Sequence, residues 1–119
     1  MRYEIYDVAN VKAYPNQENE KETTARPAIV IEDLQDEVLL CPVTKQVYQA
    51  ANYKYTIYVD KDSDDGKQMG LTFNSIIVLD RFATLKKIRL SPVIGSCTDN
   101  IIVQIENMLD TMRKNGDYI

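Results

Sequence analysis

The sequence contains no histidine and only two cysteines, and these shortages exclude several kinds of active site. Without histidine there is no two-histidine ribonuclease mechanism, no Ser-His or Cys-His pair, and no histidine-ligated metal. Cys41 and Cys97 stand in or beside apolar sequence and form no Cys-x-x-Cys pair, so we expect reduced, buried thiols rather than a disulfide framework or a zinc site. Any chemistry must therefore use carboxylates, Arg, Lys, Tyr, Thr or Ser, and we expect no metal and no cofactor.

Long apolar runs are also missing. No stretch approaches the roughly 18 apolar residues that cross a bilayer, and the opening residues MRYEIYDV lack the apolar core of a signal peptide. We therefore expect a cytoplasmic protein with no membrane partner. A length of 119 residues, 45% hydrophobic and 27% charged, is typical of a single globular domain, here residues 1–119.

The charge balance bears on the class of partner. A net charge of -4 gives no long-range attraction for a polyanion. If the protein binds nucleic acid, it must do so at a local basic patch.

Short runs of β-type composition follow one another along most of the chain. The alternation of apolar and polar residues is clearest from Tyr53 to Asp60. The apolar runs 28–31 and 37–43 flank an acidic turn, which predicts an antiparallel hairpin. Residues 12–25 and 60–70 are polar or charged and are predicted as exposed connections. Strands are predicted within 3–11, 28–31, 37–43, 53–60, 74–82 and 84–90.

The period of the apolar residues changes near the C-terminus. A stripe at spacings of one, three and four predicts an amphipathic helix whose apolar side packs on the core, in preference to binding a partner. Thr98 or Asp99 can serve as the N-cap and Gly116 as the stop. About six short strands and one terminal helix indicate a mainly β protein with a C-terminal α-helix, built on a bent antiparallel sheet or open barrel. The stripe consists of Ile101, Ile102, Ile105, Met108, Leu109 and Met112.

Several motifs occur in an informative order: ARPAIVI, then LLCPVTKQ, then NSIIVLDRFATLKKIRL, with IGSCT after it. This ordered set resembles the MazF/PemK family of toxins from bacterial toxin-antitoxin pairs. In that family Arg-Pro leads into an apolar strand, a second strand ends in Pro-apolar-Thr-x-Gln, and a Ser-led apolar strand runs toward Thr-Leu and Lys-x-Arg-Leu. The resemblance implies a small SH3-like antiparallel barrel of the CcdB/MazF kind with a terminal helix, usually a homodimer, neutralised by a cognate antitoxin protein.

The resemblance also implies an activity. Family members are sequence-specific, metal-independent endoribonucleases, or mRNA interferases, that cleave single-stranded RNA. The 2′-hydroxyl of the substrate attacks the adjacent phosphate, leaving a 2′,3′-cyclic phosphate and a 5′-hydroxyl. The residues that the resemblance implies as catalytic are Arg26, from Arg-Pro, and Thr44, from the strand end.

The chemistry of these two side chains suits that reaction. Cleavage develops negative charge on a crowded phosphate, and a guanidinium offers a planar set of donors matched to two phosphate oxygens. The hydroxyl of Thr44 can donate one more hydrogen bond. Because arginine is almost always protonated, Arg26 is a poor general base. We interpret it as an electrostatic stabiliser and a proton donor to the leaving 5′-oxygen, and we leave the general base unassigned.

Other residues are candidates for holding the RNA. Lys45 is a candidate for phosphate contacts and Gln46 for base contacts, while Lys67 and Arg81 would extend a basic groove, with a contribution from Lys54. Single-stranded RNA is read by bases that stack on aromatic side chains, so Tyr14 and Tyr48 are conceivable platforms.

Two other classes of function stay open. A non-catalytic homologue of the same fold would act by binding, either as a decayed toxin or as a gyrase poison like CcdB. That relative relies on a C-terminal Trp-Gly-Ile, whereas this chain has no tryptophan and ends GDYI, which favours RNA cleavage. A small SH3-like peptide-binding module is expected to carry Trp and Tyr together along its groove, and here only Tyr is plentiful.

Overall fold

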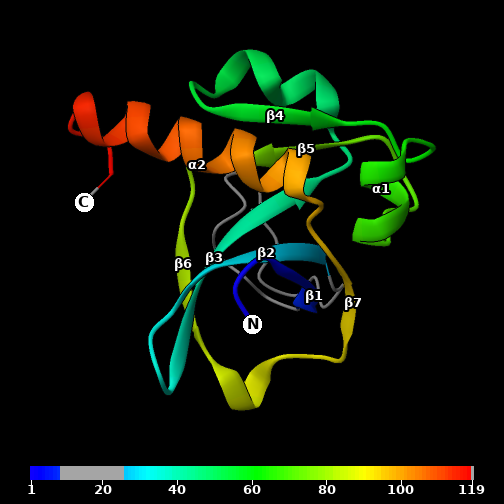
Figure 1. Cartoon of the computed structure of the whole chain (residues 1–119), viewed down its shortest axis with the longest axis vertical. Helices are drawn as coiled ribbons and strands as arrows, with labels where there is room; N and C mark the ends of the chain where they lie inside the picture. Colours follow the sequence, from blue (N-terminus) through cyan, green and yellow to red (C-terminus); the bar gives the residue numbers. More distant parts are fainter. Residues whose placement is uncertain (9–25, 119) are drawn as a thin grey trace.

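The computed structural model describes residues 1–8 and 26–118. These residues form a curled antiparallel sheet, and the last element of the chain is a helix (Figure 1). This arrangement confirms the predicted fold class. The helices are α1 (Asp64–Met69) and α2 (Asp99–Lys114), and two short 3-10 segments are η1 (Val47–Asn52) and η2 (Lys87–Arg89). The strands are β1 (Glu4–Val8), β2 (Arg26–Asp33), β3 (Glu37–Thr44), β4 (Thr56–Val59), β5 (Ser75–Val78), β6 (Ala83–Lys86) and β7 (Val93–Ser96).

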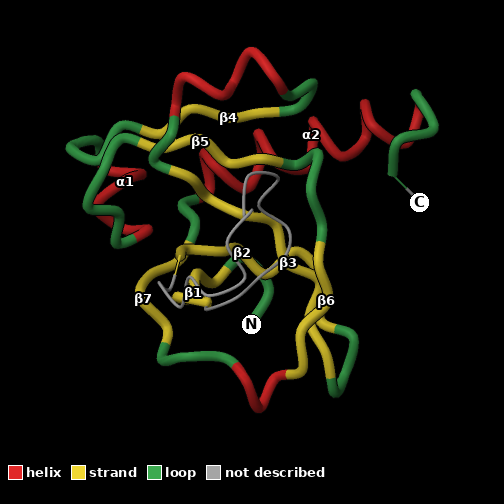
Figure 2. The backbone as a smooth tube through the Cα atoms, turned by 180° about the vertical axis from the view of Figure 1, so that it is seen from behind, coloured by secondary structure: helices red, strands yellow, loops and turns green. Residues whose placement is uncertain are grey.

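The sheet curls because one long strand, β3, is shared by two parts of it. The strand order is β4-β5-β3-β2-β1-β7, and β6 pairs with β3 outside this path. On the edge away from β2, residues 37–40 of β3 pair with β6, whereas Val43 and Thr44 pair with β5. The sheet therefore changes partner midway along β3, and the seven strands wrap into a half-barrel (Figure 2).

The hairpin β2–β3 lies at the centre of the fold and is buried on both faces. Ile29, Ile31, Cys41 and Val43 face a core that is shared with α2. A second apolar cluster on the other face contains Ala28, Val30, Val38 and Leu40, with Ala83 and Leu85 of β6 packed against it. Burial on both faces explains why these two strands read as continuous apolar runs rather than as an alternation.

Helix α2 forms as predicted and lies across one face of the sheet (Figure 1). The stripe residues Ile101, Ile105, Leu109 and Met112 are each at most 1% exposed. The Thr98 hydroxyl caps the helix by accepting a hydrogen bond from the Ile101 amide at 3.3 Å. After the helix, Gly116 takes the left-handed conformation with φ of 76°, the role expected of a glycine at a helix end. Ile102 and Met108 are partly buried beside the same core.

The strand predicted over Tyr53–Asp60 is shorter in the structure. Only Thr56–Val59 forms β4, because η1 extends to Asn52 and Tyr53 caps it. The amides of Lys54 and Tyr55 donate to the Asp80 carboxylate at 2.8 and 2.6 Å, so a side chain supplies the acceptors that a neighbouring strand would otherwise provide. The prediction was wrong for the first half of this segment.

Helix α1, strand β7 and the two 3-10 segments η1 and η2 were not predicted. Helix α1 lies in the segment 60–70 that was expected to be an irregular connection, and Ser63 caps it by accepting from the Gly66 amide. Strand β7 follows η2 and pairs with β1. The predicted strand 74–82 shortens to β5. The prediction for 84–90 was wrong in its second half, since β6 ends at Lys86 and Lys87–Arg89 forms η2.

Some predictions fall where the structure gives no description. The expected connection 12–25 and the last residues of the predicted strand 3–11 lie outside the described residues. Within residues 1–8 and 26–118, no helix combines the length and the apolar character needed to span a membrane.

Candidate functional site

A pocket of about 600 Å³ lies where β1 and β3 end and β2 begins. The connection from α1 to β5 and one residue of β7 complete its wall. The lining residues are Asp7, Arg26, Pro27, Val43, Thr44, Lys45, Gln46, Gly70, Leu71, Thr72, Phe73, Ser75 and Ile94. The motifs ARP, PVTKQ and the Ser of NSIIV, which are far apart in the sequence, thus contribute to one concave site.

The register of the central hairpin brings Arg26 and Thr44 to the same end of the sheet. The β2–β3 ladder ends with Ala28 paired to Pro42, and Arg26 and Thr44 lie two residues beyond this pair in their strands. Arg26 itself pairs with Val8 of β1, and Thr44 pairs with Ile76 of β5. Both residues line the pocket, so the pair predicted as catalytic shares one site.

Local hydrogen bonds fix the strand end that carries Thr44. Thr44 is only 7% exposed, and its Oγ1 accepts a hydrogen bond from the Gln46 amide at 3.1 Å. The bond uses the oxygen as an acceptor, so the hydroxyl hydrogen still suits donation to a ligand. Thr44 is therefore a positioned hydroxyl at the edge of the pocket.

The Gln46 side chain is also held. Its Oε1 accepts from Nε2 of the buried Gln49 at 2.7 Å, and the Tyr53 hydroxyl donates to Oε1 of Gln49 at 3.3 Å. The two hydrogens on the Gln46 amide nitrogen can donate to a polar ligand. The position next to the pocket suits a residue that reads a base edge.

The charged residues of the lining favour an anion. Arg26 and Lys45 are cationic and Asp7 is the one carboxylate among the described lining residues, so the lining carries a formal charge of two minus one, or +1. The whole chain carries -4. The lining is therefore more positive than the chain as a whole.

A glycine sets the close packing of the pocket wall. Gly70 ends α1 with φ of 74°, and a Cβ built there would lie 2.3 Å from the main-chain oxygen of Ile94. Any other residue would be strained in this conformation and would push the α1–β5 connection away from β7. Gly70 therefore lets two walls of the pocket meet.

A protein-family model matches most of the chain. The family model described as PemK-like, MazF-like toxin of type II toxin-antitoxin system matches residues 2–112. The chain belongs to this PemK/MazF-like toxin family. No curated protein matches the chain.

Solved structures of mycobacterial proteins share the PemK/MazF-like fold. An endoribonuclease in complex with its cognate antitoxin is 16% identical, with a TM-score of 0.59 over 93% of this chain and 89% of that chain. A mycobacterial endoribonuclease is 18% identical, with a TM-score of 0.60 over 93% and 88%. The Mycobacterium tuberculosis toxin MazF-mt6 is 18% identical, with a TM-score of 0.62 over 98% of both chains. At these identities the likeness concerns the fold.

The predicted RNA-binding residues of this PemK/MazF-like chain divide into two groups. Lys45 and Gln46 line the pocket beside Thr44. Lys67 and Arg81 do not line it: Lys67 is exposed on α1, and the Arg81 guanidinium lies 5.9 Å from the ring centre of Tyr53, beyond the far end of β5. A role for Lys67 and Arg81 in RNA binding stays a prediction.

The remaining candidates also lie away from the lining. Lys54 forms an ion pair with Asp117 at 3.2 Å, and hydrogen bonds to Asp117 and to the Tyr55 hydroxyl raise the pKa of the lysine. Tyr48 is 73% exposed on η1, close in sequence to Gln46. Tyr14 lies outside the described residues.

The two cysteines do not act as nucleophiles in this structure. Both are buried and free, as expected from the sequence. Burial raises the pKa of Cys41 far above its usual range and that of Cys97 to about 12, so neither thiol ionises near neutral pH. Among the described residues, no group of three or more Cys, Asp or Glu side chains is arranged to hold a metal ion.

Sequence reasoning missed Asp7 and Phe73 as members of the site. Asp7 reaches the pocket because β1 pairs with β2 and sets Asp7 opposite Pro27. Phe73 reaches it through the α1–β5 connection. Ser75, which begins the Ser-led strand of the family pattern, also lines the pocket, although the sequence did not predict it as a site residue.

Proposed function

We propose that this chain is the toxin of a bacterial toxin-antitoxin pair and acts as a sequence-specific endoribonuclease on single-stranded RNA. The observation that carries the proposal is the convergence of Arg26 and Thr44 on one pocket with a cationic lining. Membership of the PemK/MazF-like toxin family supports it, because the resemblance implies these two residues as the reactive pair. The fold shared with mycobacterial proteins described as endoribonucleases is consistent with it.

The proposed reaction needs only groups that the pocket and its substrate supply. The substrate's 2′-oxygen forms a bond to phosphorus as the bond from phosphorus to the 5′-oxygen breaks, which gives a cyclic phosphate and a free 5′-hydroxyl. Negative charge grows on the phosphoryl oxygens during this step. The Arg26 guanidinium donates hydrogen bonds to those oxygens and transfers a proton to the departing 5′-oxygen, and the proton that leaves the 2′-hydroxyl restores the guanidinium. The Thr44 hydroxyl donates one more hydrogen bond to the phosphoryl group.

Asp7 is our proposed acceptor for the proton of the 2′-hydroxyl. A general base must be unprotonated at neutral pH and able to reach the proton that it removes. Arg26 and Lys45 are cations, and among the described lining residues Asp7 is the one carboxylate. Asp7 of β1 and Arg26 of β2 come from neighbouring strands, and both line the pocket, which supports a shared action on one phosphate.

Two protein partners belong to the proposal. A cognate antitoxin segment carrying acidic and apolar residues would pair with Arg26 and Lys45 and pack on Leu71 and Phe73, and so would exclude RNA from the pocket. A second copy of the chain would form the homodimer that the resemblance implies. Cleavage chemistry, antitoxin binding and dimer formation are each testable on the purified chain.

The decisive experiment treats a long natural RNA with the purified wild-type chain in excess chelator and maps the new ends. We expect cuts at one short sequence, with 5′-hydroxyl and cyclic phosphate ends. Ends bearing 5′-phosphates would contradict the proposed chemistry. RNA that stays intact at high protein excess would instead favour the non-catalytic homologue.

A further inference from the structure

We propose that Phe73 and Lys45 form a stacking platform on which one nucleobase of the RNA rests, next to the phosphate that is cut. This inference rests on the proposed function and adds the residue that holds a base. Phe73 lines the pocket and is 55% exposed, and Lys45 is adjacent in sequence to Thr44. Among the described lining residues Phe73 is the one aromatic side chain.

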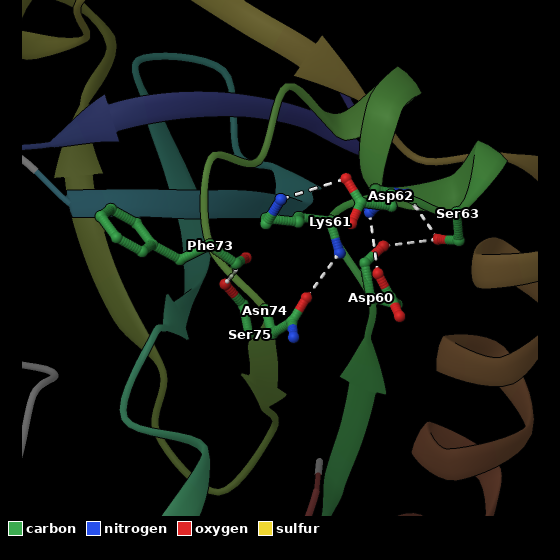
Figure 3. A network of polar contacts seen from close by, with 8 residues as sticks. Asp60, Lys61, Asp62, Ser63, Phe73, Asn74 and Ser75 are labelled. Carbon is green, nitrogen blue, oxygen red and sulfur yellow. Dashed lines mark hydrogen bonds and ion pairs between the residues drawn. The ribbon is translucent and has the colours of Figure 1, made fainter.

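Hydrogen bonds hold the chain on both sides of Phe73, which fixes the position of the residue that carries the exposed ring. The Ser75 hydroxyl donates to the main-chain oxygen of Phe73 at 2.8 Å. Oδ1 of Asn74 accepts from the Lys61 amide at 3.0 Å, which ties this connection to the turn before α1. Figure 3 shows the Phe73 ring pointing away from the polar network around Asp60–Ser63 that anchors its neighbours.

The lysine and the ring are already in contact. Nζ of Lys45 lies 4.7 Å from the centre of the Phe73 ring, within the range of a cation–π interaction. This contact occupies part of the ring and holds a positive charge at the edge of the pocket. The exposed part of the ring offers an apolar surface for a second flat group, and the ammonium offers a partner for the phosphate attached to it.

A nucleotide matches this pair of groups better than a purely apolar ligand does. Single-stranded RNA is bound by aromatic side chains that stack on bases, combined with cations that follow the backbone. Here the aromatic ring, Lys45 and Arg26 border the same pocket. A base on Phe73 would leave its phosphate in the pocket that Arg26, Lys45 and Thr44 line.

The test uses the absence of tryptophan from the chain, because Phe73→Trp introduces a unique fluorophore. The probe is a short single-stranded RNA containing the sequence that the wild-type protein cuts, with every 2′-hydroxyl methylated and a dye at one end. Dye anisotropy reports binding, and tryptophan emission reports stacking. The matched control is Ile88→Trp, since Ile88 is 90% exposed on η2 at the opposite end of the β2–β3 hairpin.

We expect the emission of Phe73→Trp to fall as anisotropy rises, while the emission of Ile88→Trp stays constant. Phe73→Leu should bind the RNA roughly fivefold to a hundredfold more weakly than wild type, the loss expected for one base–aromatic stack. Phe73→Tyr should bind like wild type. An equal melting temperature for Phe73→Leu and wild type shows that the weaker RNA binding does not come from unfolding.

Three results would overturn the inference and separate its failure from that of the proposed function. Normal binding with constant Phe73→Trp emission and unweakened Phe73→Leu would refute the platform alone. An emission change that depends on protein concentration without RNA would assign Phe73 to a contact between proteins. Wild-type protein that neither binds the probe nor cuts unmodified RNA would refute both proposals.

Discussion

Replacing Thr44 by valine isolates one hydroxyl of the proposed reaction. Valine has nearly the shape of threonine and suits a strand, but it cannot donate to a phosphoryl oxygen. Removing one donor from developing negative charge costs about 3 kcal/mol, or roughly a hundredfold to a thousandfold in rate. We therefore expect Thr44→Val to cut RNA more slowly by that factor.

The stability cost of this change is small by comparison. Valine also loses the hydrogen bond from the Gln46 amide to Oγ1, which contributes about 1 kcal/mol. Thr44→Ser keeps the hydroxyl but loses a methyl group from a position that is 7% exposed, which costs a similar amount of roughly 0.8 kcal/mol. The two variants should melt at similar temperatures, and only the valine variant should lose activity.

The assay is single-turnover cleavage of an end-labelled RNA that contains the wild-type cleavage sequence, with protein in excess. Thermal unfolding is followed on the same preparations. If folded Thr44→Val cut RNA within about threefold of the wild-type rate, the hydroxyl would stabilise the transition state by much less than the expected value of about 3 kcal/mol. If Thr44→Ser lost as much activity as Thr44→Val, the methyl group and the packing would be responsible instead.

Three further predictions address other parts of the molecule. Asp7→Asn should slow single-turnover cleavage by roughly a hundredfold or more, as for loss of a general base, without weakening binding of the methylated RNA; an unchanged rate would remove Asp7 from the reaction. Ile105→Ala, at a site with 0% exposure on α2, should lower the free energy of unfolding in urea by about 2–5 kcal/mol; a loss under about 1 kcal/mol would contradict its place in the core. Cys41 and Cys97 should both resist a thiol-specific reagent in the native protein at neutral pH and react once it is unfolded, because burial raises both thiol pKa values; rapid reaction of the native protein would contradict their burial.

The parts of the fold that the sequence predicted well are those with a strong periodic signal. The stripe of α2 repeats over four buried positions from Ile101 to Met112, with Thr98 as the cap. The β2–β3 hairpin follows from two apolar runs around an acidic turn. In these segments, tertiary packing stabilises the same secondary structure that the local sequence pattern favours.

The errors have identifiable physical causes. Tyr55 looked like part of a strand, but its amide is bonded to Asp80, which lies 25 residues away in the sequence. Helix α1 has only six residues and carries no apolar stripe, so its main sequence signals were Ser63 as the cap and Gly70 as the stop. Strand β7 spans four residues, none of them fully buried, and depends on pairing with β1.

The site was predictable where it depends on the central hairpin. A hairpin around the acidic turn brings the start of β2 and the end of β3, which carry Arg26 and Thr44, to the same end of the sheet. Asp7 and Phe73 were not predictable in this way, because each enters the pocket through a tertiary contact. Arg81 illustrates the opposite case, since it was predicted to extend the basic groove but lies near Tyr53 and does not line the pocket.

The central claim is that the pocket containing Arg26 is where RNA is cut, and cleavage by Arg26→Ala tests it most directly. The measurement is the single-turnover rate in excess chelator on the mapped RNA, with Arg26→Lys as the matched variant that keeps the charge but loses the planar pair of donors. We predict that folded Arg26→Ala cuts at least about a hundredfold more slowly than wild type, with Arg26→Lys between the two. Cleavage by folded Arg26→Ala at the wild-type rate and at the same sequence would contradict the account.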